Sequence, residues 1–429
     1  MNKQSNFSKF MLLWAGELIS AVGGGLTSFG LGVYVFRQTG SAASMALVTL
    51  LAFLPTLLLS IPAGVLADRH DRRLLMMLGD GCSALGILYI LLCMMWSEAA
   101  LWQICTGVFI SSTFSALLEP SYRATVTDLL TKEEYSKASG LVSLAGSARY
   151  LISPVLAGAL LAVSDIKLLL VIDICTFFPT VFAAAFVRKG IEKKVTECQV
   201  FFIDSLRQGW RAVTGNRGIL ILIVVSAALT CFMGTFQTLA QPLILDFADS
   251  TTLGIGETIC ASGMLVSSLF LGAKGIQRGY VKTLCLFLLA AGVSIAGFSI
   301  WKNIYPVCLF GFLFFASLPF ANNCLDYLVR VNIPDELQGR AWGLIGFLSQ
   351  IGYVVAYGAA GAIADGIAAR FQISVGRGAA WVVMGAGVLL GLTAVVLYLP
   401  KSVRGLEHSC GKCWIGPSEL SLWEQRQAD

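Results

Sequence analysis

Ionisable side chains within long apolar stretches are the first residues of this sequence that could do chemistry. Glu17, Arg149 and Asp173 each lie in such a stretch. A charged group inside a membrane is costly, so it normally faces the protein interior and marks a path for ions or protons. Burial favours a neutral carboxyl group, whereas a nearby arginine favours the charged form. The pattern therefore predicts proton binding and release by Glu17 and Asp173, with Arg149 beside one of them.

Structural roles remain open for the same acids. Glu17 could be neutralised by a fixed partner, and Asp173 could anchor the packing of two helices. Composition supports the membrane setting on which both interpretations depend. Of 429 residues, 56% are hydrophobic and 13% charged, whereas a soluble domain is about one quarter charged. The composition excludes an ordinary soluble domain.

Twelve runs of about 20 mainly apolar residues follow one another along the chain, the first at about 10–36 and the last at about 378–400. They predict an all-α integral membrane protein with twelve transmembrane helices in two pseudo-symmetric six-helix bundles. The first run resembles a signal peptide but is too long for one. The expected domains are an N-terminal bundle, a linker with an amphipathic or ordinary linker helix, a C-terminal bundle and a tail, at residues 1–187, 188–217, 218–400 and 401–429.

An internal repeat supports the division into two bundles. Gly140-Leu141, Tyr150 and Ala157-Gly158 recur at the same spacing as Gly343-Leu344, Tyr353 and Ala360-Gly361. Two parallel halves with a site between them are typical of secondary transporters. Basic residues concentrate in the loops that share a side with both termini, which predicts cytoplasmic termini in a plasma membrane.

The most charged short loop lies between the second and third runs and reads GVLADRHDRRL from Gly64 to Leu74. Together with the twelve spans and the repeat, this loop resembles the signature of the major facilitator superfamily. The resemblance rests on Gly64, Asp68, Arg69, Arg72 and Arg73, while Asp71 replaces a more usual glycine. Trp14-Ala15-Gly16, Ile172-Asp173 and the stretch IPDELQGR at 333–340 are similar to the drug–proton antiporter branch, which includes macrolide efflux proteins and the enterobactin exporter.

The resemblance implies roles for three further groups of residues. The loop would act as a gate, with Glu119 and Arg123 as its partners, although it could instead only set the topology. Ser153, Pro154, Ala157 and Gly158 partly match the antiporter motif of the fifth helix. Central-cavity residues would come from spans seven and ten, although most of the phenylalanines could face lipid: Phe232, Phe236, Gln237, Gln241, Phe315, Asn322, Asn323 and Asp326.

Other chemistry is poorly represented in the sequence. His408, Cys410 and Cys413 supply three of the four ligands that a closed zinc site needs. No phosphate-binding loop is present, so we expect neither an enzyme nor direct use of ATP. The sequence favours a monomeric exporter that needs no cofactor, is driven by a proton gradient and acts on a lipophilic, macrolide-like molecule. A siderophore or lipid-like metabolite exporter and a transport-dead sensor or scaffold are the alternatives.

Overall fold

The computed structural model describes residues 6–131, 134–188, 217–276, 279–333, 335–400, 403 and 406, without the side chains of residues 68, 136 and 335–343. The described residues form helices and no strand, and they include twelve segments long and apolar enough to cross a membrane. The helices of the N-terminal half are α1 (Phe7–Thr39), α2 (Ala42–Arg69), α3 (Arg72–Trp96), α4 (Leu101–Ser115), α5 (Leu118–Leu129), α6 (Tyr135–Leu151), α7 (Ser153–Val163) and α8 (Ile166–Arg188). Those of the C-terminal half are α10 (Arg217–Leu245), α11 (Ser250–Lys274), α12 (Tyr280–Phe298), α13 (Ile304–Asn332), α14 (Asp335–Phe371) and α15 (Val375–Tyr398).

Two of the twelve spans are each divided into two helices. The fourth span consists of α4 and α5, and the fifth consists of α6 and α7, which meet at Ile152. Proline cannot donate a backbone hydrogen bond, so Pro120 and Pro154 leave the carbonyl groups of Ala116 and Tyr150 without their helical donors. Both helix breaks therefore coincide with a proline, but proline alone does not break a helix here, because Pro55 and Pro62 lie inside the continuous α2.

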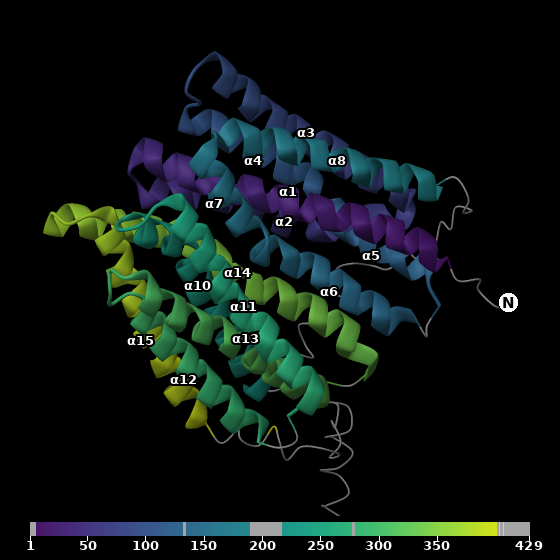
Figure 1. Cartoon of the computed structure of the whole chain (residues 1–429). Coiled ribbons are helices and arrows are strands. Elements are labelled where there is room, and N and C mark those ends of the chain that lie inside the picture. The colour runs from purple at the N-terminus through teal and green to yellow at the C-terminus, as the bar shows by residue number, and fades with distance from the viewer. Residues whose placement is uncertain are drawn as a thin grey trace, which may run out of the picture.

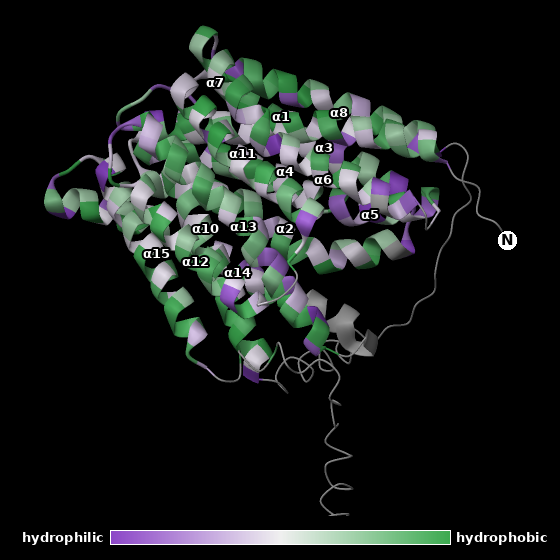
Figure 2. Ribbon diagram, turned by 60° about the horizontal axis from the view of Figure 1, so that its bottom comes forward, coloured by the Kyte–Doolittle hydropathy of each residue, from purple (hydrophilic) through white to green (hydrophobic). Residues whose placement is uncertain are grey.

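The two halves lie side by side and diverge from one end of the molecule. Figure 1 shows α1–α8 across the top and α10–α15 below, close together at the left and spread apart at the right. Apolar residues cover the helices along most of their length, as Figure 2 shows. This surface suits contact with lipid, because helices need no polar outer face in a bilayer.

The halves meet at what we call the closed end, comprising residues 37–43, 158–166, 244–254 and 361–375. Helix α7 packs on α11 there, and α14 packs on α2. A Cβ atom added at Gly158 would lie 2.6 Å from the Ser250 carbonyl oxygen, and one added at Gly361 would lie 2.5 Å from that of Ala42. Glycine therefore permits both close approaches.

Polar contacts also join the halves at the closed end. Asp365 of α14 accepts hydrogen bonds from Ser41 Oγ (2.6 Å) and from the backbone N–H groups of Ala42 (2.9 Å) and Ala43 (3.0 Å). A carboxylate is favourable at a helix N-terminus because it satisfies free N–H groups and the helix dipole. Asp365 thus caps α2 from the opposite half.

A second polar contact lies at the start of α11. Arg37 of α1 donates a hydrogen bond to Ser250 Oγ (2.6 Å). Asp249 caps α11 by accepting from the Thr252 N–H (2.9 Å), and hydrogen bonds from Thr252 lower the pKa of Asp249. The first turns of α2 and α11, which both lie at this interface, are therefore held by side chains.

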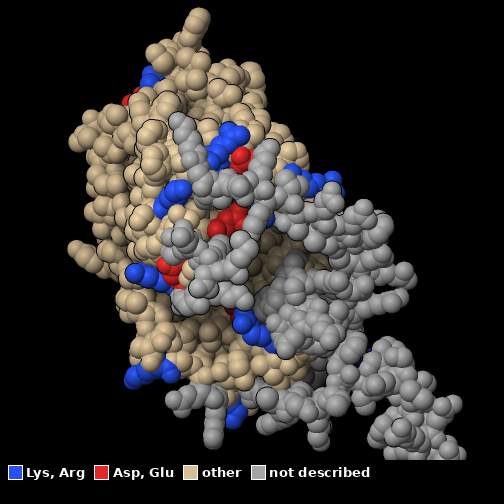
Figure 3. All heavy atoms as spheres, turned by 90° about the vertical axis from the view of Figure 1, so that its right-hand side faces the viewer, with Lys and Arg blue, Asp and Glu red and all other residues tan. Residues whose placement is uncertain are grey.

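The opposite end, which we call the open end, carries the Gly64–Leu74 segment, the end of α8 and the start of α10. The segment is mostly helical, because α2 continues to Arg69 and α3 begins at Arg72, so only His70 and Asp71 lie between helices. We keep the name Gly64–Leu74 loop for the whole segment. Figure 3 looks onto this side, where Lys and Arg side chains are spread over the surface with acidic groups between them. The expected amphipathic helix at 200–213 and the tail from His408 to Cys413 lie outside the described residues.

Candidate functional site

Acidic side chains from three helices gather inside the N-terminal half. Glu17 lies on α1, Asp80 on α3 and Asp173 on α8, and Asp80 interacts electrostatically with the other two. Asp80 and Asp173 are each only 1% exposed. Glu17 Oε2 and Asp80 Oδ2 are buried without a hydrogen-bond partner. An unpaired buried carboxylate is costly, so the cluster is suited to holding protons.

Arg149 lies beside this cluster on α6 and is exposed. Its guanidinium donates a hydrogen bond to Ser28 Oγ (2.9 Å), and its charge acts on both Glu17 and Asp173. The predicted grouping of Glu17, Arg149 and Asp173 is therefore present as an electrostatic neighbourhood. Asp173 Oδ1 is also 3.5 Å from Thr176 Oγ1.

The Gly64–Leu74 loop is bound to its own half through Arg72 and Asp71. Arg72 forms an ion pair with Asp128 of α5 (3.0 Å) and donates a hydrogen bond to the Ala124 carbonyl (3.2 Å). Asp71 caps α3 by accepting from the Arg73 N–H (3.1 Å) and pairs with Arg188 of α8 (2.8 Å).

The expected partners of the loop are placed differently. Arg123 pairs with Glu119 one turn away on α5 (2.8 Å), and both side chains are largely exposed. Asp128 and Arg188 take the contacts with the loop. Arg69 is exposed and Arg73 is buried. Gly64 is half-buried, and the side chain of Asp68 lies outside the described set.

The fifth-helix motif forms part of the contact between helices. Ser153 Oγ donates a hydrogen bond to the Val22 carbonyl of α1 (3.0 Å), and Gly254 of α11 lies against Pro154. Ala157 is fully buried and Gly158 contacts the start of α11. These residues join α7 both to α1 and to the other half.

The predicted cavity residues of α10 fall into two environments. Phe236 is 4% exposed and packs against Phe314 and Phe315, with ring centroids 4.8 and 5.9 Å away. Phe232 is partly buried against the same core. Gln237 instead accepts a hydrogen bond from the Tyr357 hydroxyl of α14 (2.8 Å).

Gln241, one turn beyond Gln237 on α10, is 9% exposed, and its side chain interacts with Glu257 of α11. The Oε1 atom of Gln241 is buried without a partner. A Cβ atom added at Gly32 of α1 would lie 2.5 Å from this oxygen. Gln241 therefore reaches the boundary between the halves.

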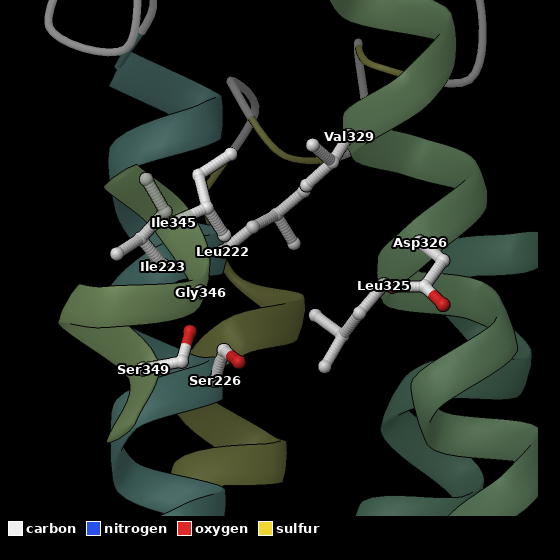
Figure 4. Close-up of a pocket in the computed structure, with 9 residues that line it drawn as sticks. All are labelled: Leu222, Ile223, Ser226, Leu325, Asp326, Val329, Ile345, Gly346 and Ser349. Atoms are coloured by element: carbon white, nitrogen blue, oxygen red, sulfur yellow. The ribbon is translucent and has the colours of Figure 1, made fainter. Parts of the chain in front are cut away.

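Asn322, Asn323 and Asp326 are exposed on α13. Asp326 also lines a cavity of about 170 Å³ between α10, α13 and α14. Figure 4 shows apolar side chains from α10 and α14 on one side of this cavity and Asp326 apart from them on α13. The cavity lies toward the open end and is mainly apolar.

Two acids in this arrangement were missed by sequence reasoning. Asp80 and Glu257 both lie inside apolar runs, as Glu17 does, and the same rule on intramembrane charge could have found them. Their partners could not have been read from the sequence, because each contacts helices distant along the chain.

Comparison with known proteins places this geometry in context. The family model described as "Major Facilitator Superfamily" matches residues 13–357. Macrolide efflux protein A from Streptococcus pyogenes is 24% identical over 413 residues, which cover 95% of this chain and 100% of that protein.

Solved structures share the fold at low sequence identity. A bacterial homologue of the iron transporter ferroportin in an inward-facing state matches with a TM-score of 0.70 and 16% identity, over 92% of this chain and 100% of that one. A bacterial homologue of ferroportin in an outward-facing state matches with a TM-score of 0.59 and 16% identity, over 91% of this chain and 100% of that one.

Proposed function

The chain belongs to the Major Facilitator Superfamily, and on that premise we propose that it exports lipophilic small molecules by proton-coupled alternating access. Its family and fold are those of transporters, and its multiple spans place it in a membrane. The bacterial relatives support the plasma membrane as that location. Under the proposal the chain acts as a monomer and needs no cofactor beyond the proton gradient.

The observation that carries the proposal is the buried acid cluster beside the junction of two halves that meet at one end. Proton transfer to Glu17 or Asp173 changes the charge next to Arg149, and Asp80 interacts electrostatically with both of these acids. A change in charge can favour one of two conformations only if the conformations contact the charge differently. Helix α6, which carries Arg149, adjoins α1 of its own half and α11 of the other half, so a movement of the halves would change the surroundings of Arg149.

The direction of transport rests on the distribution of charge and on the relatives. Basic residues gather at the open end, where α1 begins and α15 ends, which favours a cytoplasmic open end. Substrate would then enter from the cytoplasm or inner leaflet and leave when the closed end opens. The lipophilic class is supported by the apolar cavity near α13 and by similarity to Macrolide efflux protein A.

An efflux assay tests the proposal. Cells that produce the wild type, Glu17→Gln or Asp173→Asn are loaded with a panel of lipophilic drugs and dyes, with and without a protonophore. We expect wild-type cells to accumulate less of at least one compound, and the protonophore and both substitutions to remove this difference. Glu98→Gln, in an exposed loop, provides a matched control.

Efflux that survives the protonophore and both substitutions would overturn proton coupling through these acids. Purified protein in liposomes separates transport from a scaffold role. Absence of flux under a pH gradient for every compound of the panel would overturn the proposed export.

A further inference from the structure

Glu257 is a half-buried acid in the C-terminal half to which proton coupling assigns no role. It lies within the span formed by α11. Among the residues that the structure describes, no lysine or arginine forms an ion pair with it. An acid at this depth without a basic partner suggests a functional site, because its charge is costly inside a membrane.

The faces of α11 show where Glu257 points. Ile255 and Ile259 are 46% and 42% exposed and mark the side away from the protein. Thr258 bonds to the Leu151 carbonyl of the other half (3.0 Å), and Cys260 packs against α13. With 100° between successive residues, Glu257 lies between these two packed sides and opposite the lipid side.

The same stripe of α11 becomes accessible toward the open end. Met264 and Ser268 follow Glu257 at seven and eleven residues, a spacing that keeps them on one helix face. Met264 is 45% exposed and Ser268 is also exposed. Because this face points away from the lipid side, its exposed part at Met264 and Ser268 borders the space between the halves, with the buried Ala261 between it and Glu257.

Polar groups extend from Glu257 across α10. The Gln241 side chain interacts with Glu257, and Gln237 lies one turn earlier, about 6 Å away along the helix surface. Gln237 in turn accepts from the Tyr357 hydroxyl. The unpartnered Gln241 Oε1, nine-tenths buried, provides a further acceptor at this point.

Aromatic rings complete the site from both halves. Phe53 of α2 lies 5.6 Å from the Tyr353 ring and 5.5 Å from the Tyr357 ring, measured between centroids. Faces of aromatic rings attract cations, most strongly when the cation is desolvated. The charge of Arg149 acts on Tyr357, and it also acts on Glu17 and Asp173 in the N-terminal half.

We propose that Glu257 binds the cationic group of an amphiphilic substrate, with Gln241 as a neighbouring acceptor and the Phe53, Tyr353 and Tyr357 rings around its apolar part. The substrate class is then a lipophilic cation, either a protonated amine or a quaternary onium ion. This inference rests on the proposed export function. Substrate charge is bound in the C-terminal half, whereas protons are held in the N-terminal half.

Binding to purified full-length protein tests the site directly. Tetraphenylphosphonium, a lipophilic cation, is compared with neutral triphenylphosphine oxide by isothermal titration calorimetry. We expect the wild type to bind the cation at least tenfold more tightly than the neutral compound. Glu257→Gln removes this preference, Glu257→Asp retains part of it, and Glu98→Gln leaves it unchanged. Thermal unfolding of each variant verifies that it is folded.

Either of two binding results would overturn the assignment. One is that the wild type does not bind the cation, and the other is that Glu257→Gln keeps the wild-type preference for the cation over the neutral compound. Export of neutral and cationic drugs by cells that produce Glu257→Gln distinguishes recognition from coupling. Selective loss of cation export supports recognition, whereas equal loss of every compound assigns Glu257 to coupling and overturns the inference. A wild type that exports nothing overturns the proposed function instead.

Discussion

Asp80 is the single residue whose substitution most directly tests the acid cluster. It is as buried as Asp173, and its Oδ2 atom has no hydrogen-bond partner. We expect Asp80→Asn to lower proton-driven export by about tenfold, which corresponds to about 1.4 kcal/mol in the barrier. The measurement is dye efflux from liposomes under an imposed pH gradient.

Exchange of substrate without a pH gradient provides the control for this variant. Asp80→Asn should retain exchange, because Glu257, the proposed site for the substrate, lies in the C-terminal half. Equal loss of both activities would show that Asp80 is needed for the fold rather than for protons.

Arg72 permits a prediction about the free energy of unfolding. Its ion pair with Asp128 is mostly buried, with side chains 18% and 25% exposed, whereas those of Arg123 and Glu119 are 71% and 65% exposed. Hydrogen bonds to charged groups contribute about 1.5–3 kcal/mol, and exposed helix pairs about 0.3–0.5 kcal/mol. Arg72→Ala should therefore destabilise the protein far more than Arg123→Ala.

Denaturant unfolding of the purified variants measures this difference. A double-mutant cycle with Asp128→Asn isolates the pair from the other contacts of Arg72. Equal effects of Arg72→Ala and Arg123→Ala would show that the loop is not held by Asp128.

Local sequence predicts some pairings of this region and conceals others. The Glu119–Arg123 spacing of four residues already favours an ion pair on one helix. These two side chains therefore bind each other rather than the Gly64–Leu74 loop. Asp128 and Arg188 reach the loop only because α5 and α8 pack beside α3. Asp71, which replaces the glycine more usual in the family signature, also has a physical role, since it caps α3 and binds Arg188.

At the scale of helices, the close contact of α14 with α2 depends on Gly361. A Cβ atom there would lie 2.5 Å from the Ala42 carbonyl, whereas one at Gly358 would meet nothing within 4 Å. Alanine is favoured over glycine in helices by about 1 kcal/mol. We expect Gly361→Ala to weaken the closed end and reduce export, and Gly358→Ala to preserve both.

Accessibility to a membrane-impermeant thiol reagent measures the effect on the closed end. In a cysteine-free background, Ser41→Cys should label faster when combined with Gly361→Ala than when combined with Gly358→Ala. Identical labelling of the two would show that α14 accommodates the added methyl group without moving.

Hydropathy predicts the number of spans well because the bilayer imposes a minimum apolar length on each helix. The first expected span, 10–36, is extended to Phe7–Thr39. The breaks at Ala116 and Ile152 both lie just before a proline, but the sequence does not distinguish these prolines from Pro55 and Pro179, which lie inside continuous helices. Which helices pair across the halves was beyond prediction, because Asp365 and Ala42 are joined only by the packing of α14 on α2.

For the whole molecule, the closed end must separate if the halves alternate. Asp365 then loses its three hydrogen bonds to Ser41, Ala42 and Ala43, and α2 loses its cap from the opposite half. Loss of an N-cap costs about 0.5–2 kcal/mol. Asp365→Asn should therefore shift the equilibrium toward the state that is open at this end, by several-fold.

Cross-linking of the two halves tests whether this separation is required for export. In a cysteine-free background, Ser41→Cys combined with Asp365→Cys should form a covalent link with a short bifunctional thiol reagent, since the native oxygens are 2.6 Å apart. The link should stop export, and a cleavable reagent should allow recovery on reduction. Each single cysteine variant controls for the lost cap. Export that continues at the rate of the unlinked protein, despite complete cross-linking, would mean that substrate leaves by a route that does not open between α2 and α14.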